Sequence, residues 1–85
     1  MSSHARVTLI GLPGCHLCDD ARVVVGAVCE ELAIEWHEQW IDTDPVLFDQ
    51  YAELIPVVLV DGAVVATWRV NADLLRSALN SPSDR

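Results

Sequence analysis

The sequence predicts a small mixed α/β domain in which helices flank a four-stranded mixed sheet, in the order β-α-β-α-β-β-α. Two observations predict this class. Helical and strand-like hydrophobic periodicities alternate along the chain, which is typical of strands joined by helical crossovers. An Asp61-Gly62 pair then separates the last two strand-like segments and indicates an antiparallel hairpin. The first strand–helix–strand unit should therefore be a right-handed parallel crossover.

Size and composition limit the classes of protein to consider. Eighty-five residues favour a single domain over residues 1–85, with an ordered core at about 6–80 and frayed ends. A hydrophobic content of 52% favours a packed globule. No apolar run approaches the roughly 20 residues that span a bilayer, and no apolar signal region begins the chain. We therefore expect a cytoplasmic monomer.

The first strand and the first helix are predicted from an abrupt change of pattern. Residues 6–11 form an apolar run, and the Leu-Pro-Gly that follows predicts a turn. Apolar residues then recur at helical spacing over about residues 16–33. Three consecutive β-branched valines in this segment are poor helix formers, so burial must stabilise the helix.

The remaining elements are predicted as a strand at 34–41, a short helix at about 45–53, strands at 56–60 and 63–68, and a helix over 71–79. Ile34, Trp36 and Trp40 are spaced by even steps, which indicates the second strand. A polar cap followed by Pro45 at the first helical position predicts the start of the short helix. Asn71 can cap the last helix in the same way.

Two thiols lie between the predicted first strand and the first helix, in the segment Cys15-His16-Leu17-Cys18. A Cys-x-x-Cys pair in this position is typical of a redox motif. The partial positive charge and unpaired N–H groups of a helix N-terminus stabilise a thiolate at Cys15. Cys18 lies one turn away on the same face, from where it can attack a mixed disulfide at Cys15 and release the substrate. Two small buried hydrophobic residues, or a metal pair, are the alternatives.

At this point the chain resembles the glutaredoxin-like branch of the thioredoxin-fold superfamily, over nearly all of residues 6–80. The resemblance rests on Gly14-Cys15-His16-Leu17-Cys18, Ile41-Asp42-Thr43-Asp44-Pro45, Ile55-Pro56-Val57-Val58 and Asp61-Gly62, in that order. It implies a thiol–disulfide oxidoreductase with Cys15 as nucleophile and Cys18 as resolving thiol. It also implies a cis bond at Ile55-Pro56, and a substrate that pairs with the Ile55 backbone as a short added strand.

The sequence departs from the family pattern at positions that affect which electron donor the protein can use. Glutathione-using glutaredoxins usually have a lysine shortly before the first cysteine and Pro-Tyr between the two, and both are replaced here. The Gly-Gly expected at the start of the last helix is also replaced, which leaves Arg69 and Asn71 as the obvious partners for an anion. We therefore expect a thioredoxin-reductase-type system to serve better than glutathione. No bound cofactor is expected, although a low-molecular-weight thiol can act as the donor.

Other residues have two interpretations each. His16 can stabilise the thiolate and make the disulfide more oxidising, or it can be exposed with no role. Cys29 lies eleven residues after Cys18 on the same helix, about three turns away, which predicts a core or half-buried thiol. The three tryptophans are predicted mainly as core residues, with a partner-binding surface as the alternative.

The net charge and the order of the elements bear on functions other than redox chemistry. The net charge of −8 argues against nucleic-acid and anionic-membrane partners, so a disulfide-bearing protein or a small thiol is the expected partner. Copper-chaperone domains also carry a Cys-x-x-Cys between a first strand and helix, but they run strand, helix, strand, strand, helix, strand. An iron–sulfur role and a non-catalytic binding module are further alternatives. We predict no metal site.

Overall fold

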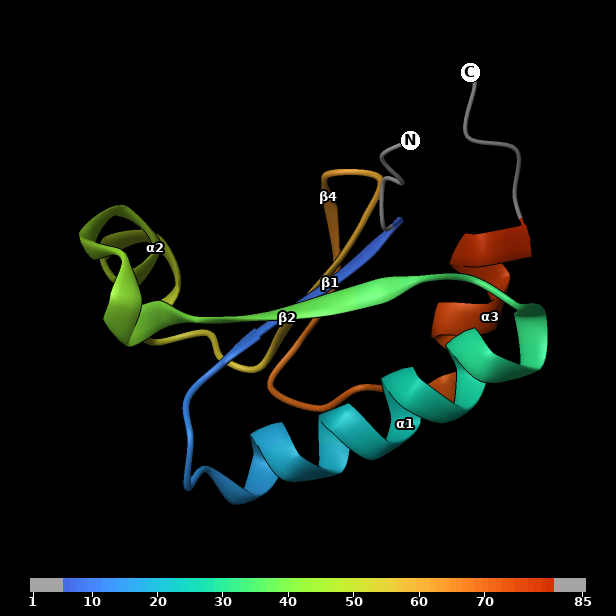
Figure 1. The fold of residues 1–85 in the computed structure, drawn as a ribbon, viewed down its shortest axis with the longest axis horizontal. Coiled ribbons are helices and arrows are strands. Elements are labelled where there is room, and N and C mark those ends of the chain that lie inside the picture. Colours follow the sequence, from blue (N-terminus) through green and yellow to red (C-terminus); the bar gives the residue numbers. More distant parts are fainter. Residues whose placement is uncertain (1–5, 81–85) are drawn as a thin grey trace.

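A computed structural model describes residues 6–80, and Figure 1 shows its elements in sequence colours. The frayed ends expected at 1–5 and 81–85 lie outside the described residues. The elements are β1 (Val7–Gly11), α1 (His16–Leu32), β2 (Trp36–Trp40), the short 3-10 helix η1 (Ile41–Thr43), α2 (Pro45–Tyr51), β3 (Val57–Val60), β4 (Ala63–Thr67) and α3 (Ala72–Asn80). Apart from η1, their order is the predicted β-α-β-α-β-β-α. Within residues 6–80 the last element is the helix α3, which differs from the order of copper-chaperone domains.

The four strands form one mixed sheet in the order β2-β1-β3-β4. β1 pairs in parallel with β2 and antiparallel with β3, and β3 pairs antiparallel with β4. The predicted parallel pairing of the first two strands and the predicted hairpin are both confirmed. The hairpin turn places Asp61 and Gly62 in the left-handed region, at φ 52° and 87°, as a two-residue turn of this kind requires. Arg6 holds this turn through two hydrogen bonds to the Asp61 carboxylate.

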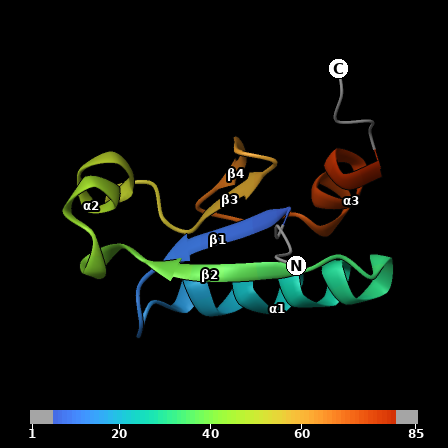
Figure 2. The same ribbon diagram turned by 45° about the horizontal axis from the view of Figure 1, so that its top comes forward.

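Alternation along the central strands divides the core between the two faces of the sheet. Val7 and Leu9 of β1 belong to a cluster with buried residues of α1 and α3, whereas Ile10 belongs to a second cluster beside α2. Figure 2 shows α1 lying along the sheet, with α2 beyond the end of β2 and α3 at the opposite end of the molecule. None of the helices in residues 6–80 has both the length and the apolar character needed to span a membrane.

The predicted helix caps are present. The Asp44 carboxylate accepts the Val46 N–H at 2.9 Å at the start of α2. The Asn71 side-chain oxygen accepts the Leu74 N–H at 3.0 Å at the start of α3. These bonds satisfy N–H groups that have no partner within the helix, so each short polar side chain fixes where its helix begins.

The prediction of a core position is wrong for one tryptophan. Trp36 and Trp40 are half-buried, but Trp68 is 57% exposed. β4 ends at Thr67, one residue earlier than predicted, and Trp68 turns out of the sheet with φ at 63°. Its indole N–H donates to the Glu53 carbonyl at 3.0 Å, so the exposed ring is fixed in place.

Cys29 provides a test of the core. Its thiol is fully buried in the cluster between α1, α3 and the sheet, and burial raises its pKa. Cys29→Ala should lower the free energy of unfolding by about 1 kcal/mol through lost packing, and should leave thiol exchange unchanged. Val23→Ala on the same helix is the control, since that side chain is 71% exposed and its loss should not lower stability. Denaturant unfolding of both variants, with a loss confined to Cys29→Ala, checks the prediction.

Candidate active site

Cys15 occupies the N-cap position of α1, at the end of the turn that follows β1. Its backbone is extended, with φ −93° and ψ 121°, and its side chain is half-buried. The Cys18 backbone N–H donates to the Cys15 sulfur at 3.3 Å. One of the donors that has no partner within the helix is thus directed at the Cys15 sulfur.

Cys18 lies one turn further on and is fully buried. Burial and a hydrogen bond to Cys15 raise the pKa of Cys18 to about 11, while the Leu12 backbone N–H and the charge of Arg22 act in the opposite direction. The two thiols therefore differ as a nucleophile and a resolving thiol should. The accessible sulfur is the one with a backbone donor, and the buried sulfur keeps its proton near neutral pH.

Gly11 was not predicted as a site residue, but it allows the Cys18 side chain to pack against the end of β1. A methyl group at Gly11 would lie 2.9 Å from the Cys18 Sγ and 3.2 Å from its Cβ. Because real carbon contacts of this kind are longer, only glycine allows β1 to end against the first turn of α1. A glycine that ends an apolar strand is a signal of close backbone approach that was available in the sequence.

The Ile55-Pro56 bond is cis, as the resemblance implied. Ile10 of β1 pairs with Val57 of β3, so continuing the register by one residue places Pro56 opposite Gly11, the residue against which Cys18 packs. Pro56 is buried and Ile55 is half-buried. Within residues 6–80, neither the N–H nor the C=O of Ile55 has a hydrogen-bond partner, whereas the Leu54 and Pro56 carbonyls both accept the Trp68 N–H.

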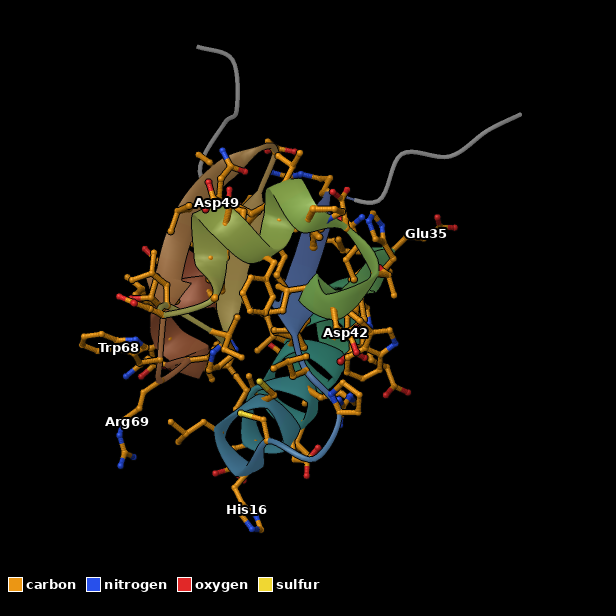
Figure 3. All side chains as sticks on the ribbon, turned by 90° about the vertical axis from the view of Figure 1, so that its left-hand side faces the viewer. His16, Glu35, Asp42, Asp49, Trp68 and Arg69 are labelled. Carbon is orange, nitrogen blue, oxygen red and sulfur yellow. The ribbon has the colours of Figure 1, made fainter. Side chains whose placement is uncertain are left out.

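A small hollow of about 80 Å³ lies between α1 and the segment that joins β4 to α3. It is lined by Leu17, Asp20, Ala21 and Val24 of α1 and by Trp68, Arg69 and Val70. Figure 3 shows Trp68 and Arg69 on the same side of the molecule, with the Arg69 guanidinium extending into solvent. The structure thus brings Arg69 to the first two turns of α1, while Asn71 lies just beyond the hollow as the cap of α3.

His16 is exposed, and Figure 3 shows its side chain extending outward from the start of α1. Its predicted effect on the thiols stays a prediction. Two larger hollows, of about 470 and 480 Å³, lie on either side of Phe48 in α2, and their linings include neither cysteine of the motif. Across residues 6–80, no group of three or more His, Cys, Asp or Glu side chains converges as a metal site would require.

Arg22, another residue that sequence reasoning missed, lies one turn after Cys18. Its guanidinium donates to both carboxylate oxygens of Glu38 in β2, at 2.7 to 3.1 Å, and to Asp19 at 2.7 Å. The same group lies over the Trp40 ring, with its central carbon 5.6 Å from the ring centroid. No short-range sequence pattern indicates these contacts, because Glu38 and Trp40 belong to the next strand.

Comparison with known proteins places this geometry in a family. The model of the Glutaredoxin-like domain (DUF836) matches residues 6–80. Two uncharacterized mycobacterial proteins, Rv0508 of Mycobacterium tuberculosis and Mb0520 of Mycobacterium bovis, are each 28% identical, over 98% of this chain and 96% of theirs.

Solved structures agree on the fold. Protein XcR50 from X. campestris is 29% identical, with a TM-score of 0.74 over 89% of this chain and 99% of its own. Protein Ne2328 from Nitrosomonas europaea gives a TM-score of 0.73 at 19% identity, over 92% and 98% of the two chains. The glutaredoxin grx-1 from Archaeoglobus fulgidus gives 0.62 at 17% identity, over 91% and 88%. The thioredoxin-like glutaredoxin fold predicted from the sequence is confirmed.

Gly11 gives a prediction with a matched control. Gly11→Ala should lower the free energy of unfolding by about 1–3 kcal/mol, because the new methyl group would overlap the Cys18 thiol. Gly26→Ala on α1 should be neutral or stabilising, since its methyl group would meet the Trp36 ring at 3.6 Å and alanine favours helix. Denaturant unfolding of the reduced proteins compares them. Equal midpoints for the two variants would show that Cys18 is not held against Gly11.

Proposed function

The chain belongs to the glutaredoxin-like domain family, and on that premise we propose that it is a thiol–disulfide oxidoreductase with Cys15 as nucleophile and Cys18 as resolving thiol. The single observation that supports this most directly is the bond from the Cys18 N–H to the Cys15 sulfur, with the Cys18 thiol buried behind it. A half-exposed sulfur with a backbone donor is suited to attack, and a buried thiol one turn away is suited to resolve the product.

The reaction has two exchanges. The Cys15 thiolate attacks one sulfur of the substrate disulfide, so that the substrate S–S bond breaks, a mixed disulfide forms and the other substrate sulfur leaves as a thiolate. Cys18 then gives its proton to solvent and attacks the Cys15 sulfur. The Cys15–Cys18 disulfide forms, and the second substrate sulfur leaves. The substrate gains two electrons, and an external thiol donor returns two electrons to the dithiol.

The Ile55 backbone is the proposed docking edge for the substrate. Its N–H and C=O are unpaired within the described residues 6–80, and the β3 register places the neighbouring Pro56 beside Gly11 and Cys18. A segment of substrate that pairs with Ile55 as an added strand would present its disulfide to Cys15. This mode suits a disulfide-bearing protein, and we propose such a cytoplasmic partner for a monomeric enzyme. His16 is proposed to tune the potential of the pair from its position beside Cys15.

The division of roles predicts a trapped intermediate. Cys18→Ser, incubated with a peptide that contains an intermolecular disulfide, should accumulate a stable mixed disulfide at Cys15, because the resolving attack is removed. Mass spectrometry under non-reducing conditions locates the adduct. Cys15→Ser is the matched control and should form no such adduct. An adduct on Cys29, or one on Cys18 in the unaltered chain, would reverse or remove the assignment.

The donor is proposed to be a dithiol system of the thioredoxin-reductase type. A carboxylate-bearing donor such as glutathione needs cationic or N–H partners. Arg6, Arg22 and Arg76 each hold an ion pair, so Arg69 is the one guanidinium in residues 6–80 without a carboxylate. Asn71 at the start of α3 is the second proposed anion partner. Asp20 lines the same hollow as Arg69, and repulsion from an exposed carboxylate costs only about 0.2–1 kcal/mol.

A coupled NADPH assay with each donor, on the same disulfide substrate, tests this proposal. We expect slower turnover with glutathione and glutathione reductase, because each missing charged hydrogen bond lowers affinity by roughly ten- to a hundredfold. Arg69→Ala should lower the remaining glutathione rate, and Arg76→Ala, whose ion pairs lie with Glu31 and Asp73, should not. A faster rate with glutathione than with the dithiol system would contradict the proposal.

A further inference from the structure

The second exchange imposes a requirement on Cys18 that the two thiols do not meet by themselves. Cys18 has no exposed surface, and its burial opposes the loss of a proton. A buried thiolate is unfavourable unless nearby donors or cations compensate for the lost water. The Leu12 backbone N–H is one such donor. The residues around Cys18 should therefore contain a further group that favours its anion.

Arg22 is that group by position. It follows Cys18 by one helical turn on the same face of α1. Long side chains in a helix lean toward the N-terminus, so the Arg22 guanidinium lies over the turn that contains Cys18 and Asp19. The 2.7 Å bond from Arg22 to Asp19 agrees with this direction. The positive charge is therefore directed back toward the thiols and not toward the C-terminal end of the helix.

Three contacts from two elements keep the guanidinium there. Glu38 of β2 binds it through both carboxylate oxygens, and the Glu38 side chain is only 18% exposed. Trp40 covers one face of the group, and Asp19 binds it from α1. A planar guanidinium that is bound in a fork and stacked on an aromatic ring has few alternative positions. Its charge near Cys18 is therefore fixed before any substrate arrives.

The groups around Cys18 shift its pKa in opposite directions. The groups whose charge acts on Cys18 are Cys15 and Arg22 on α1, and Arg22 is itself bound by Asp19 on α1 and Glu38 on β2. The charge of Arg22 lowers the pKa of Cys18, whereas neither carboxylate is among the groups that raise it. The charge of Arg22 therefore opposes the effects of burial and of Cys15 on the Cys18 thiol, and the two carboxylates hold the guanidinium in place.

We propose that Arg22 is a positioning residue for the second exchange, and that its anchored guanidinium stabilises the Cys18 thiolate as it attacks the mixed disulfide at Cys15. This inference rests on the proposed oxidoreductase function. Arg22 touches neither the substrate nor the bond that breaks. It acts on the proton that Cys18 must release to solvent, and hence on the fraction of Cys18 that can attack at a given pH.

A reaction with dithiobis-nitrobenzoate separates the two exchanges. Cys15 attacks this aromatic disulfide and releases one coloured thiolate. Cys18 then attacks the mixed disulfide, forms the Cys15–Cys18 bond and releases the second. Stopped-flow absorbance records both releases from about pH 6 to about pH 9. Arg22→Gln should leave the first rate unchanged, slow the second by about three- to tenfold, and move its pH profile to higher pH. Arg22→Lys, which keeps the charge, should restore most of the second rate.

Arg76→Gln is the matched control. Arg76 binds one carboxylate on its own helix, Asp73, and one on another element, Glu31, as Arg22 does, but it lies on α3. Its loss should change neither release. If Arg22→Gln does not fold, the double variant R22M/E38Q, which removes the anchor carboxylate with the cation, should show the same slow second release.

The possible results distinguish the role of Arg22 from the oxidoreductase function on which it rests. A normal second release in Arg22→Gln, or equal slowing of both releases, would overturn the role of Arg22 and leave the oxidoreductase function standing. Failure of Arg22→Lys to restore the second rate would also overturn it, since the charge would then not be the cause. Absence of a second release in the unaltered protein would overturn the oxidoreductase function and the inference together.

Discussion

The close contact between Gly11 and Cys18 is the constraint on which the rest of the site depends. It joins the end of β1 to the first turn of α1 at a distance that only a glycine permits. The helix α1 begins at His16 with Cys15 as its N-cap, and the backbone N–H of Cys18 donates to the Cys15 sulfur. The contact with Gly11 buries Cys18 and raises its pKa, so that one thiol is accessible and the other is held in its protonated form.

The topology of the sheet determines what surrounds this contact. β1 is an inner strand, and its C-terminal end lies between the end of a parallel strand and the beginning of an antiparallel one. Gly11 is therefore paired with Trp40 of β2 on one side, while Pro56, just before β3, lies on the other. Segments distant in sequence thus meet at the N-terminus of α1. The proposed docking edge at Ile55 and the proposed role of Arg22 both depend on this arrangement.

Local patterns made the fold and the two thiols predictable. The caps at Asp44 and Asn71, the Asp61-Gly62 turn and the Cys15–Cys18 spacing all depend on residues within one turn of each other. Helix geometry alone also placed Cys29 away from the reactive pair. The site residues that were missed depend on contacts between elements. Gly11 matters because α1 packs on it, and Arg22 matters because β2 supplies Glu38 and Trp40. Trp68 was misplaced because β4 ends one residue earlier than its apolar pattern indicates.

Three arginines form ion pairs within residues 6–80, and only one of these arginines lies close to the Cys15–Cys18 motif. Arg6 ties the hairpin turn to β1, and Arg76 ties α3 to α1. Exposed pairs of this kind contribute little to stability, because water and salt screen their attraction. Arg22 differs in its partners, because the Glu38 side chain is only 18% exposed and the Trp40 ring covers one face of the guanidinium, so the position of the charge is more narrowly fixed. A buried thiolate one turn away is a group that a cation held in one position can stabilise. In a chain with a net charge of −8, the proposed role of Arg22 is to supply that cation where the Cys18 thiolate forms.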